Sequence, residues 1–155
     1  MIIEAVGDFR LDDEAATSSL GAALAGALKA REAICLTGPL GAGKSTLARA
    51  LIRALTTPAE DVPSPTFTLV QFYEGAGLKV AHFDLYRLTS AEEAYEIGLD
   101  EALDDGAALI EWPERLEGHL PPDRLDIEIT IDGDGRRARL TPNGAWEGRG
   151  FEFRS

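Results

Sequence analysis

Gly38-Pro-Leu-Gly-Ala-Gly-Lys-Ser45 is the stretch that decides the fold, because it has the form G-x-x-x-x-G-K-[ST]. Its glycines lack a Cβ and permit positive φ, so backbone N–H groups can approach phosphate oxygens closely. Lys44 would place a positive charge beside the terminal phosphates, and the Ser45 hydroxyl would bind Mg²⁺. The pattern predicts a phosphate-binding P-loop with these nucleotide-binding residues: Gly38, Pro39, Leu40, Gly41, Ala42, Gly43, Lys44, Ser45 and Thr46.

The sequence on either side of this loop has the pattern that a P-loop requires. Residues 33–37 form a short apolar run, which predicts a buried strand. Between residues 44 and 55, leucines and arginines recur at helical spacing, which predicts a helix with one apolar and one charged face. The positive N-terminal end of this helix would point at the phosphates. The alternative is a glycine turn that matches the motif by chance. Such a turn is not expected to have a buried strand before it and an amphipathic helix after it.

Length and composition favour one globular domain spanning residues 1–155. The hydrophobic fraction is 45% and the charged fraction is 27%, which are ordinary values for globular proteins. No apolar run approaches the ~20 residues that cross a bilayer, and the N-terminus lacks the features of a signal peptide, so we expect a cytoplasmic protein without membrane contact. Cys35 is the single cysteine and is expected to fill the core. The net charge of −12 disfavours direct binding to bare nucleic acid.

The remaining pattern predicts an α/β protein with the P-loop NTPase fold. Its central sheet would be mixed but mostly parallel, flanked by helices, and followed by a C-terminal β-hairpin. Further strands are predicted at residues 2–6, 67–73, 78–83 and 107–110. Further helices are predicted at about 13–30, at 90–104 with a break near Gly98, and at 114–120.

The C-terminal hairpin is predicted from strict alternation of apolar and polar residues over residues 125–132. Gly133 and Asp134 can form its turn, which would place Glu128 opposite Arg139 and Ile127 opposite Leu140. Residues 143–155 show no comparable pattern, and we expect a mobile or edge tail there.

Two acidic residues follow predicted strands, where a P-loop protein needs an acid to orient Mg²⁺ and water. Asp84 follows the apolar residues 80–83, and Glu111 follows residues 107–110. Either acid could instead cap a helix or form a surface pair, and the spacing does not decide which would contact Mg²⁺. The predicted catalytic residues are Lys44, Asp84 and Glu111, and the predicted metal ligands are Ser45, Asp84 and Glu111.

The proline-rich loop after the P-loop helix contains Ser64, Thr66 and Thr68. In nucleotide switches this region reads the γ-phosphate through a hydroxyl or a backbone group, although a plain rigid turn is the alternative. Arg87 could neutralise developing phosphate charge, but pairing with an acid is the commoner outcome.

Three further features have both a functional and a structural interpretation. His82 on a strand is more often a packed histidine than a general base. Trp112 could stack on a base or a partner, or pack at the rim of the core. Residues 88–114 contain nine acidic residues and no Lys or Arg, which indicates either a solvated helix face or a docking face for a basic partner.

Four motifs together resemble the TsaE family, which belongs to tRNA threonylcarbamoyladenosine modification. They are GPLGAGKS at 38–45, SPTFTLV at 64–70, HFDLYRL at 82–88 and IEWPE at 110–114, and the resemblance covers about residues 10–131. It implies an ATP-specific protein that binds Mg²⁺ and works with a threonylcarbamoyl-transferase subunit and its non-catalytic paralogue. ATP hydrolysis would reset that complex, and tRNA would be reached only indirectly.

The same resemblance implies roles for individual residues. Ser45 would bind Mg²⁺, Thr66 would belong to the first switch, Asp84 would be a catalytic acid, and Glu111 would serve Mg²⁺ with Trp112 beside it. Two positions depart from the family pattern, which usually has Asp in place of Pro39 and Thr in place of Ser45. The departure at Pro39 removes a carboxylate near the phosphates.

Three functions remain open from the sequence. The first is a slow ATPase that acts as a nucleotide switch for a partner enzyme. The second is a small-molecule P-loop kinase, which would need an acceptor pocket and usually an arginine-bearing lid. The third is a module that binds nucleotide without hydrolysis. The chain has no Asn-Lys-x-Asp motif for reading guanine, which favours ATP over GTP.

Overall fold

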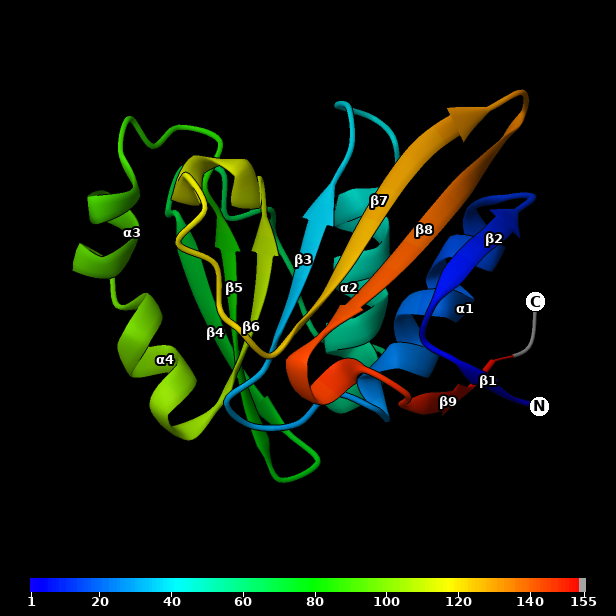
Figure 1. Ribbon diagram of the computed structural model, residues 1–155, viewed down its shortest axis with the longest axis horizontal. Helices are drawn as coiled ribbons and strands as arrows, with labels where there is room; N and C mark the ends of the chain where they lie inside the picture. The colour runs from blue at the N-terminus through cyan, green and yellow to red at the C-terminus, as the bar shows by residue number, and fades with distance from the viewer. Residues whose placement is uncertain (154–155) are drawn as a thin grey trace.

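The computed structural model describes residues 1–153 and has a seven-stranded sheet at its centre (Figure 1). Four adjacent strands run parallel to one another, as predicted for a mostly parallel sheet. In sheet order they are β7 (Arg124–Asp132), β3 (Ala33–Thr37), β6 (Ala107–Glu111) and β5 (Leu78–Asp84). Antiparallel strands complete the two ends, β4 (Val70–Gly75) beside β5, and β8 (Gly135–Asn143) and then β2 (Gly7–Leu11) beside β7.

Apolar clusters lie on both faces of the sheet. Along β3, Ile34 and Leu36 join one cluster, whereas Ala33 and Cys35 join the other. The strands β3 and β6 therefore appear in the sequence as continuous apolar runs. On β7 the apolar residues alternate with polar ones, and Leu125, Ile127 and Ile129 all belong to the first cluster. Burial raises the pKa of the Cys35 thiol to about 12, so the prediction of a core cysteine is confirmed.

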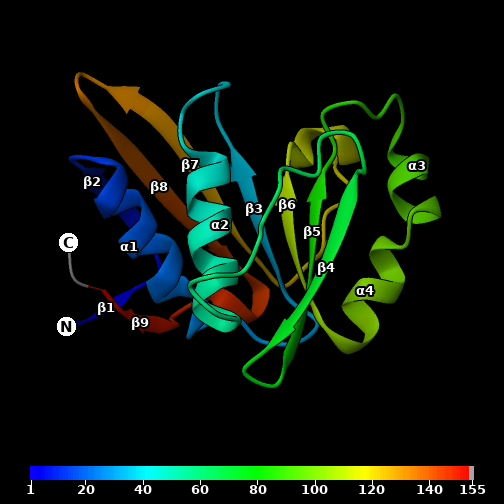
Figure 2. The same cartoon turned by 180° about the vertical axis from the view of Figure 1, so that it is seen from behind.

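Helices cover the two faces at different ends of the sheet. Figure 2 shows α1 (Glu14–Ala25) and α2 (Lys44–Leu55) side by side on one face. The short helices α3 (Ala91–Glu96) and α4 (Leu99–Asp105) lie beside the β4–β5–β6 end. They are separated at Gly98, whose φ is 99°, which confirms the predicted break. No helix within residues 1–153 is both long and apolar enough to span a bilayer.

The helix α1 packs closely on α2 because residue 21 is glycine. A Cβ at Gly21 would lie 2.4 Å from the Leu47 carbonyl oxygen of α2. Asp13 caps this helix, since its carboxylate accepts a hydrogen bond of 2.9 Å from the Ala16 N–H. The helix ends at Ala25 instead of the predicted residue 30. At its end the Gly26 N–H donates to the carbonyl oxygens of Ala23 and Leu24.

Strand and turn boundaries differ from the prediction in several places. The predicted strand 2–6 is shorter than expected, because the chain bends at Ala5 and the strand β1 spans only Ile2–Glu4. The next strand, β2, begins at Gly7, with φ of 99°, and was not predicted. The strand β4 begins at Val70 instead of residue 67, since Leu69 has a φ of 70° that ends the preceding turn. The predicted helix 114–120 is only a 3₁₀ turn, η1 (Pro113–Leu116), which ends where Glu117 adopts a φ of 53°.

The predicted C-terminal hairpin is present, and β4 and β5 form a second hairpin. Glu128 lies opposite Arg139, and Ile127 lies opposite Leu140, so the predicted register of β7 and β8 is confirmed. The turn between them consists of Gly133 and Asp134.

The C-terminal segment is not the tail that the sequence predicts. After β8 the chain forms a 3₁₀ turn, η2 (Gly144–Trp146), in which Trp146 has no exposed surface. It continues into β9 (Gly150–Glu152), which pairs with β1 in a small second sheet. Arg149 forms two hydrogen bonds with Glu32, of 2.6 and 2.7 Å, and its guanidinium carbon lies 4.5 Å from the Trp146 ring centroid. Residues 154 and 155 lie outside the described residues.

The Arg149 contacts predict a large contribution of this segment to stability. The Glu32 carboxylate beside it raises the pKa of Arg149, and Glu32 itself is buried. Arg149→Leu would leave that carboxylate without its ion-pair partner, so we expect a loss of about 3 kcal/mol in the free energy of unfolding. Urea denaturation measures it, with Arg139→Leu as the control, because Arg139 pairs with Asp8 on the exposed surface. Equal losses in the two variants would contradict the prediction.

Candidate nucleotide-binding site

The candidate site lies where the central parallel strands end. The strand β3 leads into the P-loop, while β5 ends at Asp84 and β6 at Glu111, which are direct neighbours in the strand register. A cavity of about 240 Å³ opens at this edge of the sheet. Its lining combines P-loop residues with Thr66, Asp84, Glu111 and Trp112, so the fold brings together segments that are far apart in the sequence.

The P-loop backbone has the conformation that glycine permits. Gly38, Gly41 and Gly43 all have positive φ, at 139°, 80° and 111°. At Gly38 a Cβ would also lie 2.2 Å from the Ile129 carbonyl oxygen on β7, so any larger residue would displace the loop from the sheet. Gly43 precedes α2, whose first turn has no side-chain cap. The N–H groups at the N-terminus of α2 are therefore available to bind an anion such as a phosphate group.

Lys44 is held against the loop that precedes it. Its ammonium group donates hydrogen bonds to the carbonyl oxygens of Gly38 and Pro39, the latter at 3.1 Å. The same nitrogen lies 4.4 Å from the Trp112 ring centroid, within the range of a cation–π interaction. Burial lowers the pKa of Lys44, and the neighbouring carboxylates, Glu111 first among them, oppose this effect.

Glu111 connects Ser45 to a buried histidine. The Ser45 hydroxyl donates to one Glu111 carboxylate oxygen at 3.3 Å, and His82 Nε2 lies 2.7 Å from the other. His82 and Glu111 are both buried, and among the described residues His82 Nδ1 has no hydrogen-bond partner. The expectation of a packed histidine is confirmed, but the sequence did not indicate its contact with Glu111.

Asp84 is bonded to the proline-rich loop. One of its carboxylate oxygens accepts a hydrogen bond of 2.9 Å from the Thr66 hydroxyl, and the other accepts one of 3.0 Å from the Tyr86 N–H. Ser64 lies 2.7 Å from the Thr66 hydroxyl. The two acids therefore have different neighbours, since Glu111 faces the predicted metal ligand Ser45 and Asp84 faces the predicted switch residue Thr66.

Arg136 is a P-loop contact that sequence reasoning missed. From the start of β8, its guanidinium donates hydrogen bonds to the carbonyls of Gly41 at 3.2 Å and Ala42 at 3.0 Å. A second cavity, of about 220 Å³, lies between this arginine, the P-loop and the start of α1, and Thr46 lines both cavities. No sequence signal marks this contact, because Arg136 is 94 residues away from Ala42.

Other candidate residues lie around the cavity or outside it. The Arg87 guanidinium stacks on the exposed Phe67 ring at 4.3 Å, and within residues 1–153 it has no acidic partner, so the expected ion pair is absent. Thr68 accepts a hydrogen bond from Gln71 and does not line the cavity. Trp112 packs at the rim and has a φ of 62°, a strained conformation for a non-glycine residue.

Comparison with known proteins identifies the family to which a chain with this site belongs. Residues 11–139 match the family model described as threonylcarbamoyl adenosine biosynthesis protein TsaE. The chain belongs to the TsaE family. A TsaE protein of Aquifex aeolicus is 39% identical over 140 residues, covering 89% of this chain and 98% of that protein. A TsaE protein of Rickettsia felis is 37% identical over 127 residues, covering 82% of this chain and 74% of that protein. Both relatives are named tRNA threonylcarbamoyladenosine biosynthesis proteins.

A solved structure shares the fold of this chain. The crystal structure of Bacillus subtilis YdiB matches with a TM-score of 0.72 and 28% identity, covering 93% of this chain and 87% of that one. The predictions of TsaE membership and of a P-loop fold with a mostly parallel central sheet are therefore confirmed.

Proposed function

We propose that this protein binds ATP with Mg²⁺ and hydrolyses it as a nucleotide switch in tRNA N6-threonylcarbamoyladenosine modification. One observation carries the proposal: in a TsaE-family chain, the P-loop lysine and two strand-end carboxylates line one cavity. The complex that the switch resets would contain a threonylcarbamoyl-transferase subunit and its non-catalytic paralogue. Contact with tRNA would be made through that complex, since the net charge of −12 repels a phosphate backbone.

The two cavities suit the two parts of a nucleotide. The cavity at Lys44 combines a cation with backbone donors, which suits the β- and γ-phosphates. The cavity at Arg136 begins at Thr46, on the other side of the P-loop, and is large enough for part of a nucleoside. We therefore place the adenosine towards α1 and the hairpin turn.

The donor set at Ser45 fits Mg²⁺, because a hydroxyl and a carboxylate lie together there. Within residues 1–153, no three or more His, Cys, Asp or Glu side chains converge as a ready-made metal site. Ser45 would therefore bind the ion together with phosphate oxygens and water, and Glu111 would hold Ser45 and that water in position. The ion, when bound, would neutralise charge on the transferred phosphoryl group.

The chain's own residues would act on the water and the phosphate. Lys44 would exchange its carbonyl contacts for phosphate oxygens and stabilise the charge that develops there. Asp84 would orient a water for in-line attack, forming a new P–O bond while the bond to the β–γ bridging oxygen breaks. Thr66, now bonded to Asp84, would sense the γ-phosphate, so its loop would differ between the ATP and ADP states.

Phosphate release from ATP, with and without the purified transferase complex, tests the proposal. We expect slow release by the protein alone and faster release with the complex. If no ADP forms even with the complex, the protein is a module that binds nucleotide without hydrolysing it. A phosphorylated product that forms only with a small acceptor would identify the alternative, a small-molecule kinase.

The Glu111 contact makes His82 a positioning residue. His82→Leu is expected to lower the turnover number about tenfold and to raise the Mg²⁺ concentration for half-maximal turnover by a similar factor. His82→Gln can still reach Glu111 with an amide nitrogen and should restore most of both values. If Gln and Leu variants behave alike, His82 only fills the core. Titration of ATP turnover with Mg²⁺ measures both effects.

The Arg136 contacts predict a role in nucleotide affinity. Arg136→Ala removes two charge-assisted hydrogen bonds to P-loop carbonyls, so we expect affinity for an ATP analogue to fall about tenfold. Arg137→Ala is the matched control, because the neighbouring arginine pairs with Asp132 at the surface. Calorimetric titration measures the affinity, and equal values for the two variants would contradict the prediction.

A further inference from the structure

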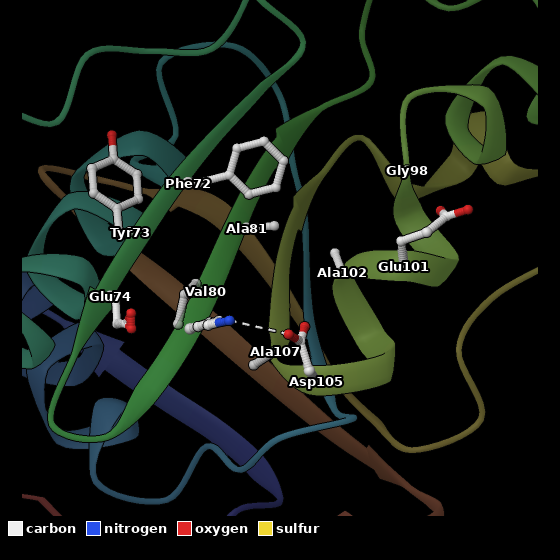
Figure 3. A pocket seen from close by; sticks show the side chains of 11 residues that line it. Phe72, Tyr73, Glu74, Val80, Ala81, Gly98, Glu101, Ala102, Asp105 and Ala107 are labelled. Atoms are coloured by element: carbon white, nitrogen blue, oxygen red, sulfur yellow. Dashed lines mark hydrogen bonds and ion pairs between the residues drawn. The ribbon is translucent and has the colours of Figure 1, made fainter.

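A third, larger cavity lies away from the nucleotide site, between the edge of the sheet and α4. Its volume is about 460 Å³, and it shares no lining residue with the cavity at Lys44. Figure 3 shows Phe72 and Ala81 directed towards α4, whereas Tyr73 on the same hairpin points the other way. The floor is made of residues with little or no side chain, namely Ala81, Ala102, Ala107 and Gly98. We call this cavity the β4–α4 groove.

The groove is apolar and open. Phe72 forms one wall and is 67% exposed, an unusual exposure for a large aromatic side chain. The strand β4 is the last strand at this end of the sheet, so in the described part of the chain no further strand covers the wall. A floor of small residues beside an exposed aromatic wall is suited to receive an apolar side chain from another molecule.

The charge around the groove is strongly negative. Glu74, Glu101 and Asp105 line it, and the basic Lys79 is already paired with Asp105 at 3.2 Å. On α4 itself Asp100 and Asp104 are also exposed. Residues 88–105, which include α3 and α4, contain seven acids and no Lys or Arg. Such a rim attracts positive charge and repels acidic partners.

We propose that the β4–α4 groove is a docking site for a basic protein segment that inserts an apolar side chain against Phe72. In the context of the proposed function, on which this inference rests, that segment belongs to the transferase complex. The lysines or arginines beside the inserted side chain would lie against Glu74, Glu101 and the exposed acids of α4. This assigns the acidic helices a partner-binding role and separates partner binding from the phosphate chemistry.

The test measures the affinity of the full-length protein for the purified transferase complex, together with ATP turnover. Phe72→Asp should raise the dissociation constant about tenfold or more, because it removes the apolar wall. Ala102→Phe fills the groove without changing charge and should have a similar effect. Glu101→Lys should weaken binding by about threefold and reduce its dependence on salt. Turnover without the complex should stay unchanged in all three variants, since none of these residues lies in the nucleotide site.

Ile131→Asp is the matched control, since Ile131 is an exposed apolar residue on the C-terminal hairpin, with 56% of its surface accessible. It should bind the complex as the unmodified protein does. The groove proposal is overturned if the unmodified protein binds the complex and is stimulated by it, and Phe72→Asp and Ala102→Phe both bind with the same affinity. If the unmodified protein itself neither binds the complex nor is stimulated by it, the proposed function fails instead.

Discussion

Lys44→Ala is expected to lower affinity for ATP by at least about a hundredfold, the largest effect that we predict on nucleotide binding. Unit charges 4 Å apart at an effective dielectric constant of 20 interact by roughly 4 kcal/mol, which exceeds the ~2.7 kcal/mol that a hundredfold change requires. Lys44 is a buried residue whose side chain lines the cavity. Its loss also leaves the Gly38 and Pro39 carbonyls without this donor.

Calorimetric titration with a nonhydrolysable ATP analogue measures this affinity. Lys29→Ala is the control, because Lys29 is exposed and does not line either cavity at the P-loop. Circular dichroism should show the same helix content in both variants. Retention of tight analogue binding by Lys44→Ala would show that the cavity at the P-loop is not where the phosphates bind.

Asp84→Asn is expected to reduce the turnover number by about a hundredfold or more, in the range for loss of a general acid–base group. Asparagine keeps a carbonyl oxygen for the Tyr86 N–H and an amide that can bond to the Thr66 hydroxyl. The loop should therefore stay in place while the negative charge is lost. Because the phosphates are held elsewhere, by the P-loop, we expect the dissociation constant of ATP to change by less than about threefold.

Single-turnover phosphate release distinguishes the chemical step from binding in this variant. Asp100→Asn, on the exposed face of α4, controls for the loss of one carboxylate from an acidic protein. If Asp84→Asn turns over at the normal rate, Asp84 does not orient the attacking water and its role is limited to holding the Thr66 loop.

Much of the candidate site could be predicted because its parts are marked locally. Within about residues 33–55, the sequence shows three consistent patterns: a buried strand, the P-loop and an amphipathic helix. Asp84 and Glu111 were recognisable because each ends an apolar strand, and the carboxyl ends of parallel strands meet at one edge of the sheet. The register of the C-terminal hairpin followed from alternation over residues 125–132 and from the two-residue turn at Gly133 and Asp134.

The errors occur where distant contacts outweigh local preference. Residues 143–153 have little pattern of their own, yet Arg149 is bonded to Glu32, more than a hundred residues earlier, and Trp146 packs in the first apolar cluster. The N-terminal residues form two separate strands because β1 pairs with β9 and β2 pairs with β8. Neither pairing can be read from the residues of one segment alone.

The sequence by itself determined a P-loop, the strands that lead to its two acids and the TsaE-family membership, since these depend on short-range periodicity and on residue types at fixed spacing. Only the tertiary structure decided which acid faces Ser45 and which faces Thr66, that His82 supports Glu111, and that Arg136 holds the P-loop. It also created the β4–α4 groove. The physical reason is that a hydrogen bond or a cavity depends on where side chains lie in space, and packing of the sheet edge against its helices sets those positions.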